Sequence, residues 1–223
     1  MQIKGAIFDM DGTLVDSLGT WDVMWQRVGE AYMGISDFKP AEEVDKKVRT
    51  MIYRDAMAYF MDYYSISGDL DEFINFTLSG IEQFYREQVE AKPGAIALLE
   101  GLHRLGIRLC LASATEMKYI RIALERLDMG KYFDAVLSCA DLHVGKDRPD
   151  IYLQSLAKLG LDAADACVFE DSFVALETAR GIGCQTVGIF DRYNFDQPRL
   201  RAASDIYLGE GVPLDHVIKE INT

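Results

Sequence analysis

Residues 3–17 read IKGAIFDMDGTLVDS, and this stretch decides the fold. The first six residues are typical of a short buried strand, and Asp9 and Asp11 follow it directly. Asp is depleted in strands, and neighbouring carboxylates repel each other unless a cation lies between them. The stretch therefore predicts a strand whose end holds a divalent metal ion and an acidic nucleophile.

The composition limits the class of protein. The chain has 223 residues, of which 36 are acidic and 23 are basic, and its formal net charge is −13. This length suffices for one large domain or for a core with a smaller module. Because nucleic-acid binding depends largely on Lys and Arg at phosphates, the charge argues against nucleic acid as the main partner. An anionic substrate would need a local positive site.

The cysteines and the N-terminal residues favour a cytoplasmic protein. No pair of cysteines is closely spaced, and we interpret all of them as buried thiols in a reducing cytosol. No signal peptide precedes the first strand, and no uncharged apolar run approaches the roughly 20 residues that a membrane span needs. We expect no membrane partner. The cysteines are Cys110, Cys139, Cys167 and Cys184.

Residues 18–90 show helical spacing with almost no strand signal. Apolar side chains recur at intervals of three and four in the stretches 21–32, 44–60 and 73–85. We expect an all-helical module over residues 16–90, inserted into a domain that residues 1–15 and 91–223 form. Its aromatic side chains are expected to pack between the helices.

From residue 93 onward, predicted helices and strands alternate. Such alternation implies an α/β fold, in which a parallel sheet has helices on both faces, and the first strand belongs to that sheet. Ligands of such sheets bind at the carboxyl ends of the strands. The later strands are expected at residues 107–112, 135–138, 166–169, 185–189 and, weakly, 205–208, with a closing helix at 214–221.

Side chains suited to phosphate chemistry follow several of these strands. Four carboxylates at one edge would concentrate negative charge that Mg²⁺ can balance while it bridges to a phosphate oxygen. A lysine and a hydroxyl there suit phosphate binding, as do backbone amides after Asp9 and at Ala114. The set comprises Asp9 and Asp11 after the first strand, Ser113 after 107–112, Lys146 after 135–138, and Glu170 and Asp171 after 166–169.

Four segments, taken in order, resemble the motifs of the haloacid dehalogenase superfamily. They are DMDGTLVDS at residues 9–17, Ser113 after a strand, GKDRPDIY at residues 145–152 and FEDS at residues 169–172. More narrowly, they resemble the phosphatase branch close to β-phosphoglucomutase, whose helical cap domain is inserted after the first motif. The resemblance covers the whole chain and implies a Rossmann-like core with an inserted all-helical cap.

The resemblance also implies residue roles. Asp9 would be the nucleophile that forms an aspartyl-phosphate, and Asp11 would act as general acid and then as general base. Because the dehalogenases proper lack this second Asp, dehalogenation is not expected. The implied catalytic residues are Asp9, Asp11, Ser113 and Lys146. The implied phosphate-binding residues are Asp11, Ser113, Ala114 and Lys146. The implied Mg²⁺ ligands are Asp9, the Asp11 backbone carbonyl, Glu170 and Asp171.

The leading hypothesis is a Mg²⁺-dependent phosphomonoesterase for a small phosphorylated metabolite, whose cap closes on hinges near residues 15–17 and 91–94. The first alternative is a sugar-phosphate mutase, although Trp21 stands where those relatives carry a cap His. A phosphonate-cleaving hydrolase would need a Schiff-base lysine, for which Lys39, Lys46 and Lys47 are the candidates. A signalling receiver domain and a catalytically inactive binding protein are weaker alternatives. The substrate and the oligomeric state stay open, a monomer included.

Some neighbouring residues carry smaller expectations. Asp16 and Ser17 are expected to cap the first helix of the cap. Asp147 stands where the family usually has a Pro, and we expect it to pair with Arg148 or to face solvent. Residues 192–195 follow a strand end and are candidates for the rim of the site.

Overall fold

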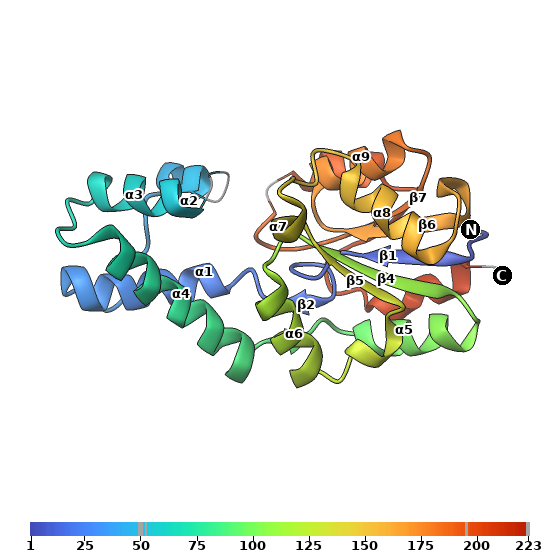
Figure 1. Ribbon diagram of the computed structural model, residues 1–223, viewed down its shortest axis with the longest axis horizontal. Helices are drawn as coiled ribbons and strands as arrows, with labels where there is room; N and C mark the ends of the chain where they lie inside the picture. The colour runs from blue at the N-terminus through green and yellow to red at the C-terminus, as the bar shows by residue number, and fades with distance from the viewer. Residues whose placement is uncertain (49–50, 52, 195, 222–223) are drawn as a thin grey trace. The chain divides into compact units, whose positions relative to one another are not determined.

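The computed structural model of the chain describes residues 1–48, 51, 53–194 and 196–221. It divides into two compact units (Figure 1). The larger unit contains Met1–Leu18 and Val89–Thr223, and the smaller unit contains Gly19–Gln88. Among the described helices, none has both the length and the apolar character that a membrane crossing requires.

The larger unit is built on a six-stranded sheet with the order β5-β4-β1-β6-β7-β8. Every pairing between neighbouring strands is parallel, which confirms the predicted α/β class. In this sheet Phe8 lies opposite both Leu111 and Phe169, so the chain segments that follow β4, β1 and β6 emerge side by side. The strands are β1 Gly5–Phe8, β4 Arg108–Ser113, β5 Ala135–Ser138, β6 Ala166–Glu170, β7 Gln185–Ile189 and β8 Ile206–Leu208.

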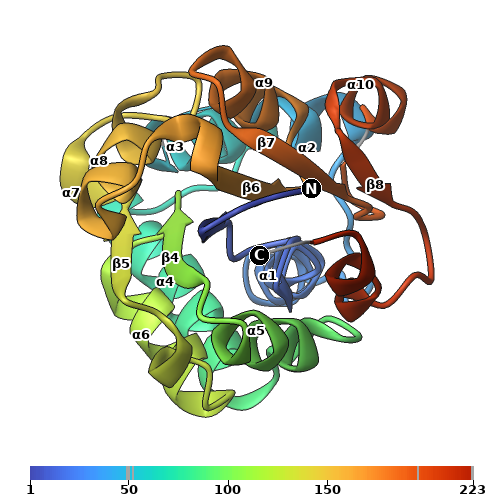
Figure 2. The same ribbon diagram turned by 90° about the vertical axis from the view of Figure 1, so that its right-hand side faces the viewer.

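Helices cover both faces of this sheet. Figure 2 shows α8 and α9 on one face and α5 and α6 on the other. Because both faces are covered, the central strands are continuous apolar runs, and Phe8 stacks on Phe169 with ring centroids 4.3 Å apart. The helices are α5 Ala95–Arg104, α6 Met117–Arg126, α7 Cys139–Leu142, α8 Asp150–Leu159, α9 Phe173–Gly181 and α10 Gln197–Ala203, with short 3₁₀ turns η2 Gly130–Tyr132 and η3 Ala163–Asp165.

The predicted closing helix is present, and it is of the 3₁₀ type. Residues 214–220 form the 3₁₀-helix η4 Leu214–Glu220. Leu214 and Val217 are both buried, and residues three apart share one face in a 3₁₀-helix. The three-residue spacing of these apolar side chains therefore suits the tighter helix.

The smaller unit is helical, with α1 Thr20–Val28, the π-helix η1 Gly29–Met33, α2 Glu42–Val48, α3 Tyr53–Tyr63 and α4 Leu70–Glu87. Its core is aromatic, as expected: Trp25 stacks on Phe60 at 4.2 Å, and Trp21 lies 5.7 Å from Trp25. The Trp25 indole donates a hydrogen bond of 2.9 Å to Asp45, which satisfies its buried N–H. Asp69 caps α4 by accepting from the amides of Asp71 and Glu72.

The segments predicted as hinges pair with each other in the larger unit. The short strands β2 Val15–Asp16 and β3 Glu90–Ala91 form an antiparallel ribbon. The Lys92 amide extends the pairing by donating to the Leu14 carbonyl at 2.9 Å. The chain therefore leaves and rejoins the larger unit along one two-stranded ribbon. Hinge motion at this ribbon stays a prediction.

Candidate active site

The turn after β1 is shaped by Gly12. The Asp9 amide donates to the Phe169 carbonyl at 3.0 Å, and the amides of Leu14 and Val15 both donate to Met10, which closes a tight turn. Gly12 has a φ of +84°, and a Cβ on it would lie 2.5 Å from Oδ2 of Asp171. Glycine is therefore required here both for its backbone conformation and for the close approach of a carboxylate.

Substitution of Gly12 should therefore destabilise the fold by more than the strain of a positive φ alone. We expect Gly12→Ala to lower the free energy of unfolding by about 1–3 kcal/mol from backbone strain, and further through the contact with Asp171. Gly106 is the matched control, because its φ is +75° and no atom of the described residues lies within 4 Å of its Cβ position. Urea unfolding of both variants checks the difference, and equal losses would show that the close approach is unimportant.

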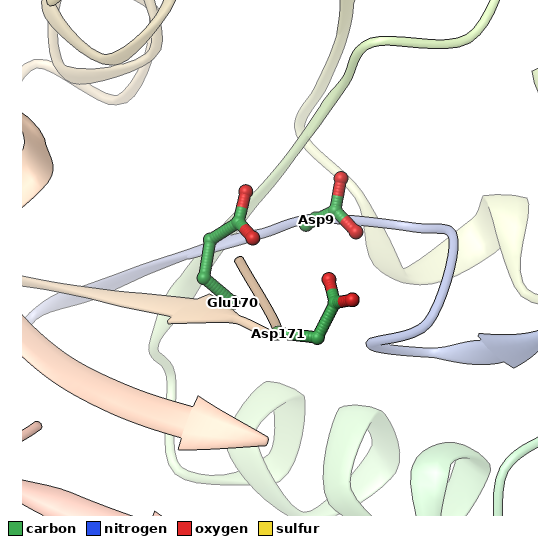
Figure 3. A group of neighbouring side chains, drawn as sticks. All are labelled: Asp9, Glu170 and Asp171. Carbon is green, nitrogen blue, oxygen red and sulfur yellow. The ribbon is translucent and has the colours of Figure 1, made fainter. Parts of the chain in front are cut away.

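Three buried carboxylates meet beyond the ends of β1 and β6. Asp9, Glu170 and Asp171 are 6%, 1% and 6% exposed, and one oxygen from each lies within 4.8 Å of the others. Figure 3 shows Asp9 on the loop after β1, close to Glu170 and Asp171 at the end of β6. Like charges at this spacing repel strongly when they are buried. A set of three carboxylate oxygens fits Mg²⁺, which prefers hard oxygen ligands.

Lys146 supplies a positive charge to the same cluster. Its Nζ donates to Oδ1 of Asp9 and, at 2.6 Å, to Oε1 of Glu170. The lysine lies in the loop between α7 and α8, after strand β5, as the sequence predicted. The neighbouring Asp147 is exposed, and Arg148 pairs with Asp150 at 3.2 Å. Of the two expectations for Asp147, the structure therefore supports the solvent-facing one.

Burial and mutual repulsion both act on the pKa values of this cluster. Burial raises the pKa of Asp9 to about 7, against the lowering effect of Lys146, and Glu170 and Asp11 add to the rise. Burial also holds the pKa of Asp171 well above its usual value, followed by the charges of Glu170 and Asp9. Burial lowers the pKa of Lys146, but Asp9 and Glu170 outweigh it and hold that pKa well above its ordinary value. A further cation in the cluster is therefore favoured.

Asp11 is held by hydroxyl groups. Ser17 donates to its Oδ1 at 2.5 Å, Thr115 donates to its Oδ2 at 2.7 Å, and Ser113 lies 3.4 Å from the same oxygen. The predicted capping role of Ser17 is wrong, since α1 has Gly19 as its N-cap with no side-chain hydrogen bond. The Ser17 hydroxyl, buried in the larger unit, is used on Asp11 instead. Asp16 pairs with Arg192 at 3.6 Å, on the exposed surface.

The sequence interpretation missed the donors that fix the other carboxylates. Thr13 donates to Oδ1 of Asp171 at 3.3 Å, and Tyr152 donates to Oε1 of Glu170 at 3.4 Å. Burial raises the pKa of Tyr152 well above its usual value, so this phenol stays a donor. The Ser172 amide donates to Oε2 of Glu170 at 3.0 Å. All three donors lie within the family motifs at residues 9–17, 145–152 and 169–172. Their location in these motifs could have identified them from the sequence.

Every residue predicted as catalytic, phosphate-binding or metal-binding lies near the ends of β1, β4 and β6 or in the loop before α8. Lys146 forms hydrogen bonds with the buried carboxylates, and the hydroxyls of Ser113 and Thr115 form hydrogen bonds with Asp11. Ala114 is exposed in the bend between β4 and α6, and its amide stays a predicted phosphate donor. Of the proposed rim segment, Phe195 lies outside the described residues.

Comparison with known proteins finds phosphatases among the relatives of this chain. A phosphorylated carbohydrates phosphatase from Thermotoga maritima is 28% identical over 221 residues, covering 98% of this chain and 100% of that protein. Hexitol phosphatase A from Escherichia coli is 30% identical over 200 residues, covering 90% of this chain and 88% of that protein. A crystal structure assigned provisionally as a β-phosphoglucomutase of Thermotoga maritima superposes with a TM-score of 0.83 at 28% identity, covering 98% of this chain and 99% of that one.

The family pattern of the haloacid dehalogenase-like hydrolases matches residues 3–183, a range that holds every residue predicted as catalytic, phosphate-binding or metal-binding. This match covers most of the chain and agrees with the four motifs in the sequence. The chain therefore belongs to the haloacid dehalogenase-like hydrolases and is an enzyme of that family.

Proposed function

We propose that this enzyme is a Mg²⁺-dependent phosphomonoesterase that acts on a small phosphorylated metabolite. The observation that carries the proposal is the buried group of Asp9, Glu170 and Asp171. Lys146 forms ion pairs with Asp9 and Glu170 in this group. One carboxylate in such a group can attack phosphorus, while the others hold a cation. The curated relatives named above act on phosphorylated carbohydrates and hexitols, which favours a sugar or polyol phosphate as the substrate class.

The proposed reaction has two half-reactions at Asp9. An oxygen of the Asp9 carboxylate attacks phosphorus, the ester P–O bond breaks, and Asp11 gives a proton to the leaving alcohol oxygen. Asp11 then takes a proton from water, whose oxygen attacks the same phosphorus and releases inorganic phosphate and free Asp9. Lys146 offsets negative charge beside Asp9 throughout. These steps balance without any oxidant or second substrate.

Mg²⁺ would be held by the side chains of Asp9, Glu170 and Asp171 and by the backbone carbonyl of Asp11. When bound, it supplies neutralisation of negative charge where the phosphoryl group binds. Thr13, Tyr152 and the Ser172 amide orient the carboxylates of Asp171 and Glu170. Such outer partners typically matter for metal affinity as well as for geometry.

The proposed acid and base, Asp11, is directed by the hydroxyls of Ser17, Thr115 and Ser113. We expect Asp11→Asn to slow hydrolysis of an alkyl phosphate by about 10²–10⁴-fold, the usual contribution of a general acid or base. Formation of the phospho-enzyme from an aryl phosphate should suffer less, because a phenolate leaves without a proton. Rapid-quench measurement of the first turnover and of steady-state turnover checks this. Equal slowing of both substrates in the first turnover would contradict the role of Asp11 as acid.

We infer that the helical unit Gly19–Gln88 acts as the cap, within the predicted range 16–90. A cap of this kind closes over the substrate, excludes bulk water and selects the leaving group. The proposed functional division is a catalytic core of residues 1–15 and 91–223 and a cap that chooses the substrate.

A sugar-phosphate mutase is the second candidate, because the superposed Thermotoga maritima structure carries that provisional assignment. Against it, Trp21 replaces the cap His of those relatives, and its ring packs 5.7 Å from Trp25 and 6.4 Å from Tyr53. A third possibility, phosphonate cleavage, has little support. Lys47 lies over the ring of Tyr59 at 3.9 Å, and the side chain of Lys46 lies outside the described residues.

One assay separates the phosphatase from the mutase. The purified chain is incubated with Mg²⁺ and a panel of hexitol phosphates, sugar phosphates, phosphoglycolate, pyridoxal phosphate and nucleotides. Multi-turnover release of inorganic phosphate from a sugar or polyol phosphate is expected. Conversion of a hexose 1-phosphate to the 6-phosphate without phosphate release would instead identify a mutase.

A further inference from the structure

A buried ion pair lies outside the acid cluster. Lys92 follows β3 and Asp191 follows β7, and Nζ lies 2.7 Å from Oδ2 with side chains that are 12% and 3% exposed. The Lys92 Nζ also donates to the Phe190 carbonyl at 2.9 Å. By contrast, the pair between Lys4 and Asp165 is 68% and 38% exposed. Because burying two charges carries a large desolvation cost, a buried pair is weak evidence for stability by itself.

Asp191 organises the loop that follows β7. Its Oδ1 accepts from the Tyr193 amide at 2.9 Å. Its main-chain carbonyl accepts from the Asn194 amide at 3.1 Å and from the Gln197 side chain at 2.8 Å. Lys92 thus holds one side of the Asp191 carboxylate, and the loop backbone holds the other. The position of Asn194 follows from these bonds.

Asn194 connects this loop to the proposed metal ligands. Its Nδ2 donates to the main-chain carbonyl of Asp171, while the Asp171 carboxylate accepts from Thr13. The strands that carry these segments are neighbours, with Glu170 opposite Gly188 in the β6–β7 register. Lys92 also reaches the β1 side, because its amide donates to the Leu14 carbonyl. Asp171 is therefore held at its carboxylate from the β1 loop and at its backbone from the β7 loop.

We propose that Lys92, Asp191 and Asn194 are positioning residues that set the place of the Asp171 carboxylate for Mg²⁺. Lys92 fixes Asp191, Asp191 fixes the turn that carries Asn194, and Asn194 fixes the backbone of Asp171. The inference rests on the proposed function, and it adds residues that touch neither the substrate nor the metal.

The chain offers substitutions that test each link. Lys92→Met keeps the aliphatic stem and removes the charge. Asp191→Asn keeps an oxygen for the Tyr193 amide and removes the ion pair, and Asn194→Ala removes the bond to Asp171. Lys92 and Asp191 line a cavity of about 410 Å³ between the β2–β3 ribbon and the loops after β7 and β8. The Met side chain is one atom shorter than that of Lys, so it fits within the space that Lys92 occupies beside this cavity. Lys4→Met and Asp165→Asn are matched controls at the exposed pair.

The readout is the affinity for Mg²⁺ alone, measured by isothermal titration calorimetry on the full chain without substrate. We expect each of the three variants to raise the Kd for Mg²⁺ by roughly 10-fold, the lower end of the effect of outer-shell changes at metal sites. The two controls should match the wild type. In turnover assays, the Mg²⁺ concentration for half-maximal rate should rise by the same factor, with KM for an aryl phosphate unchanged at saturating Mg²⁺.

A double variant tests whether the residues act in series. Asp191→Asn combined with Asn194→Ala should raise the Kd about as much as either change alone, because both break the same connection. Independent effects would multiply to roughly 100-fold and would overturn the series. Variants that lose stability but bind Mg²⁺ like the wild type would show a purely structural pair and would also overturn it.

The failure of this inference is distinct from the failure of the proposed function. A wild-type chain that binds Mg²⁺ and releases phosphate, beside variants with unchanged Kd, refutes only the positioning role. A wild-type chain that does neither refutes the proposed function and the inference together. Should Lys92→Met not fold, Asn194→Ala decides, since it removes one partly exposed amide and leaves the ion pair intact.

Discussion

Asp9→Asn is expected to abolish turnover, with a loss on the order of 10⁶-fold, the size that follows removal of a catalytic nucleophile. An amide oxygen is a poor nucleophile, so no phospho-enzyme forms. The substitution is nearly isosteric, and it removes one charge from a buried group of like charges. The fold should therefore survive, because the remaining Lys146–Glu170 pair keeps the lysine partnered.

Three measurements check this result. Steady-state release of phosphate gives the loss in kcat, and mass spectrometry of acid-quenched samples should show a phosphorylated wild type and an unmodified variant. Thermal unfolding should show that the variant is folded. Asp165→Asn, at an exposed ion pair, is the matched control and should keep full activity. Turnover by Asp9→Asn near the wild-type rate would mean that another group attacks phosphorus.

Removal of Mg²⁺ is expected to have an effect of comparable size on turnover. Chelation leaves the carboxylates of Asp9, Glu170 and Asp171 facing one ammonium, and it removes the charge that would neutralise the phosphoryl oxygens. Phosphate release should fall to the background rate and return when Mg²⁺ is restored. Activity that persists after exhaustive chelation would contradict metal dependence.

The stabilisation by Mg²⁺ should depend on pH in a defined direction. Burial raises the pKa of Asp9 from 3.8 to about 7 in the metal-free protein, with Lys146 opposing the rise. Between these two values the folded chain holds a proton that the unfolded chain releases. Raising the pH through this window therefore lowers the stability of the metal-free protein. Mg²⁺ needs the ionised carboxylate and must displace that proton at low pH.

The thermal shift caused by Mg²⁺ should accordingly be larger at pH 8 than at pH 5. At a Mg²⁺ concentration of about 100 times Kd, the gain is about 2.7 kcal/mol. Differential scanning calorimetry at both pH values, with Mg²⁺ and with a chelator, measures it. In Asp9→Asn the pH dependence of the shift should diminish, because the titrating group is absent. A shift larger at pH 5 would contradict the assignment of Asp9 as a ligand.

The parts of the site that could be predicted are those fixed by strands. Apolar runs bounded by polar residues predicted β1 and β6, and the parallel arrangement brings their ends together whatever the details of the loops. Asp9 and Glu170 each come at the end of such a run, so their proximity followed from topology. Lys146 was placed in the correct loop for the same reason.

The parts that could not be predicted depend on turns and on side-chain direction. Whether Ser17 caps a helix or donates to Asp11 is decided by the tight turn around Gly12, which no periodic pattern reports. Helix α7 spans Cys139–Leu142, too short for a helical repeat to be recognised. Lys92 and Asp191 are far apart in the sequence, and each sits beside ordinary loop residues, so nothing local indicated their pairing.

The pairing of β2 with β3 has a consequence for how such enzymes diversify. Antiparallel neighbours lie about 5 Å apart, so the host domain is interrupted by a gap no wider than one strand spacing. Inserted domains are tolerated best where the host chain ends are close together. Replacement of the entire helical segment, and with it of the proposed selector of substrate, would therefore leave the proposed nucleophile Asp9 and its surroundings as they were.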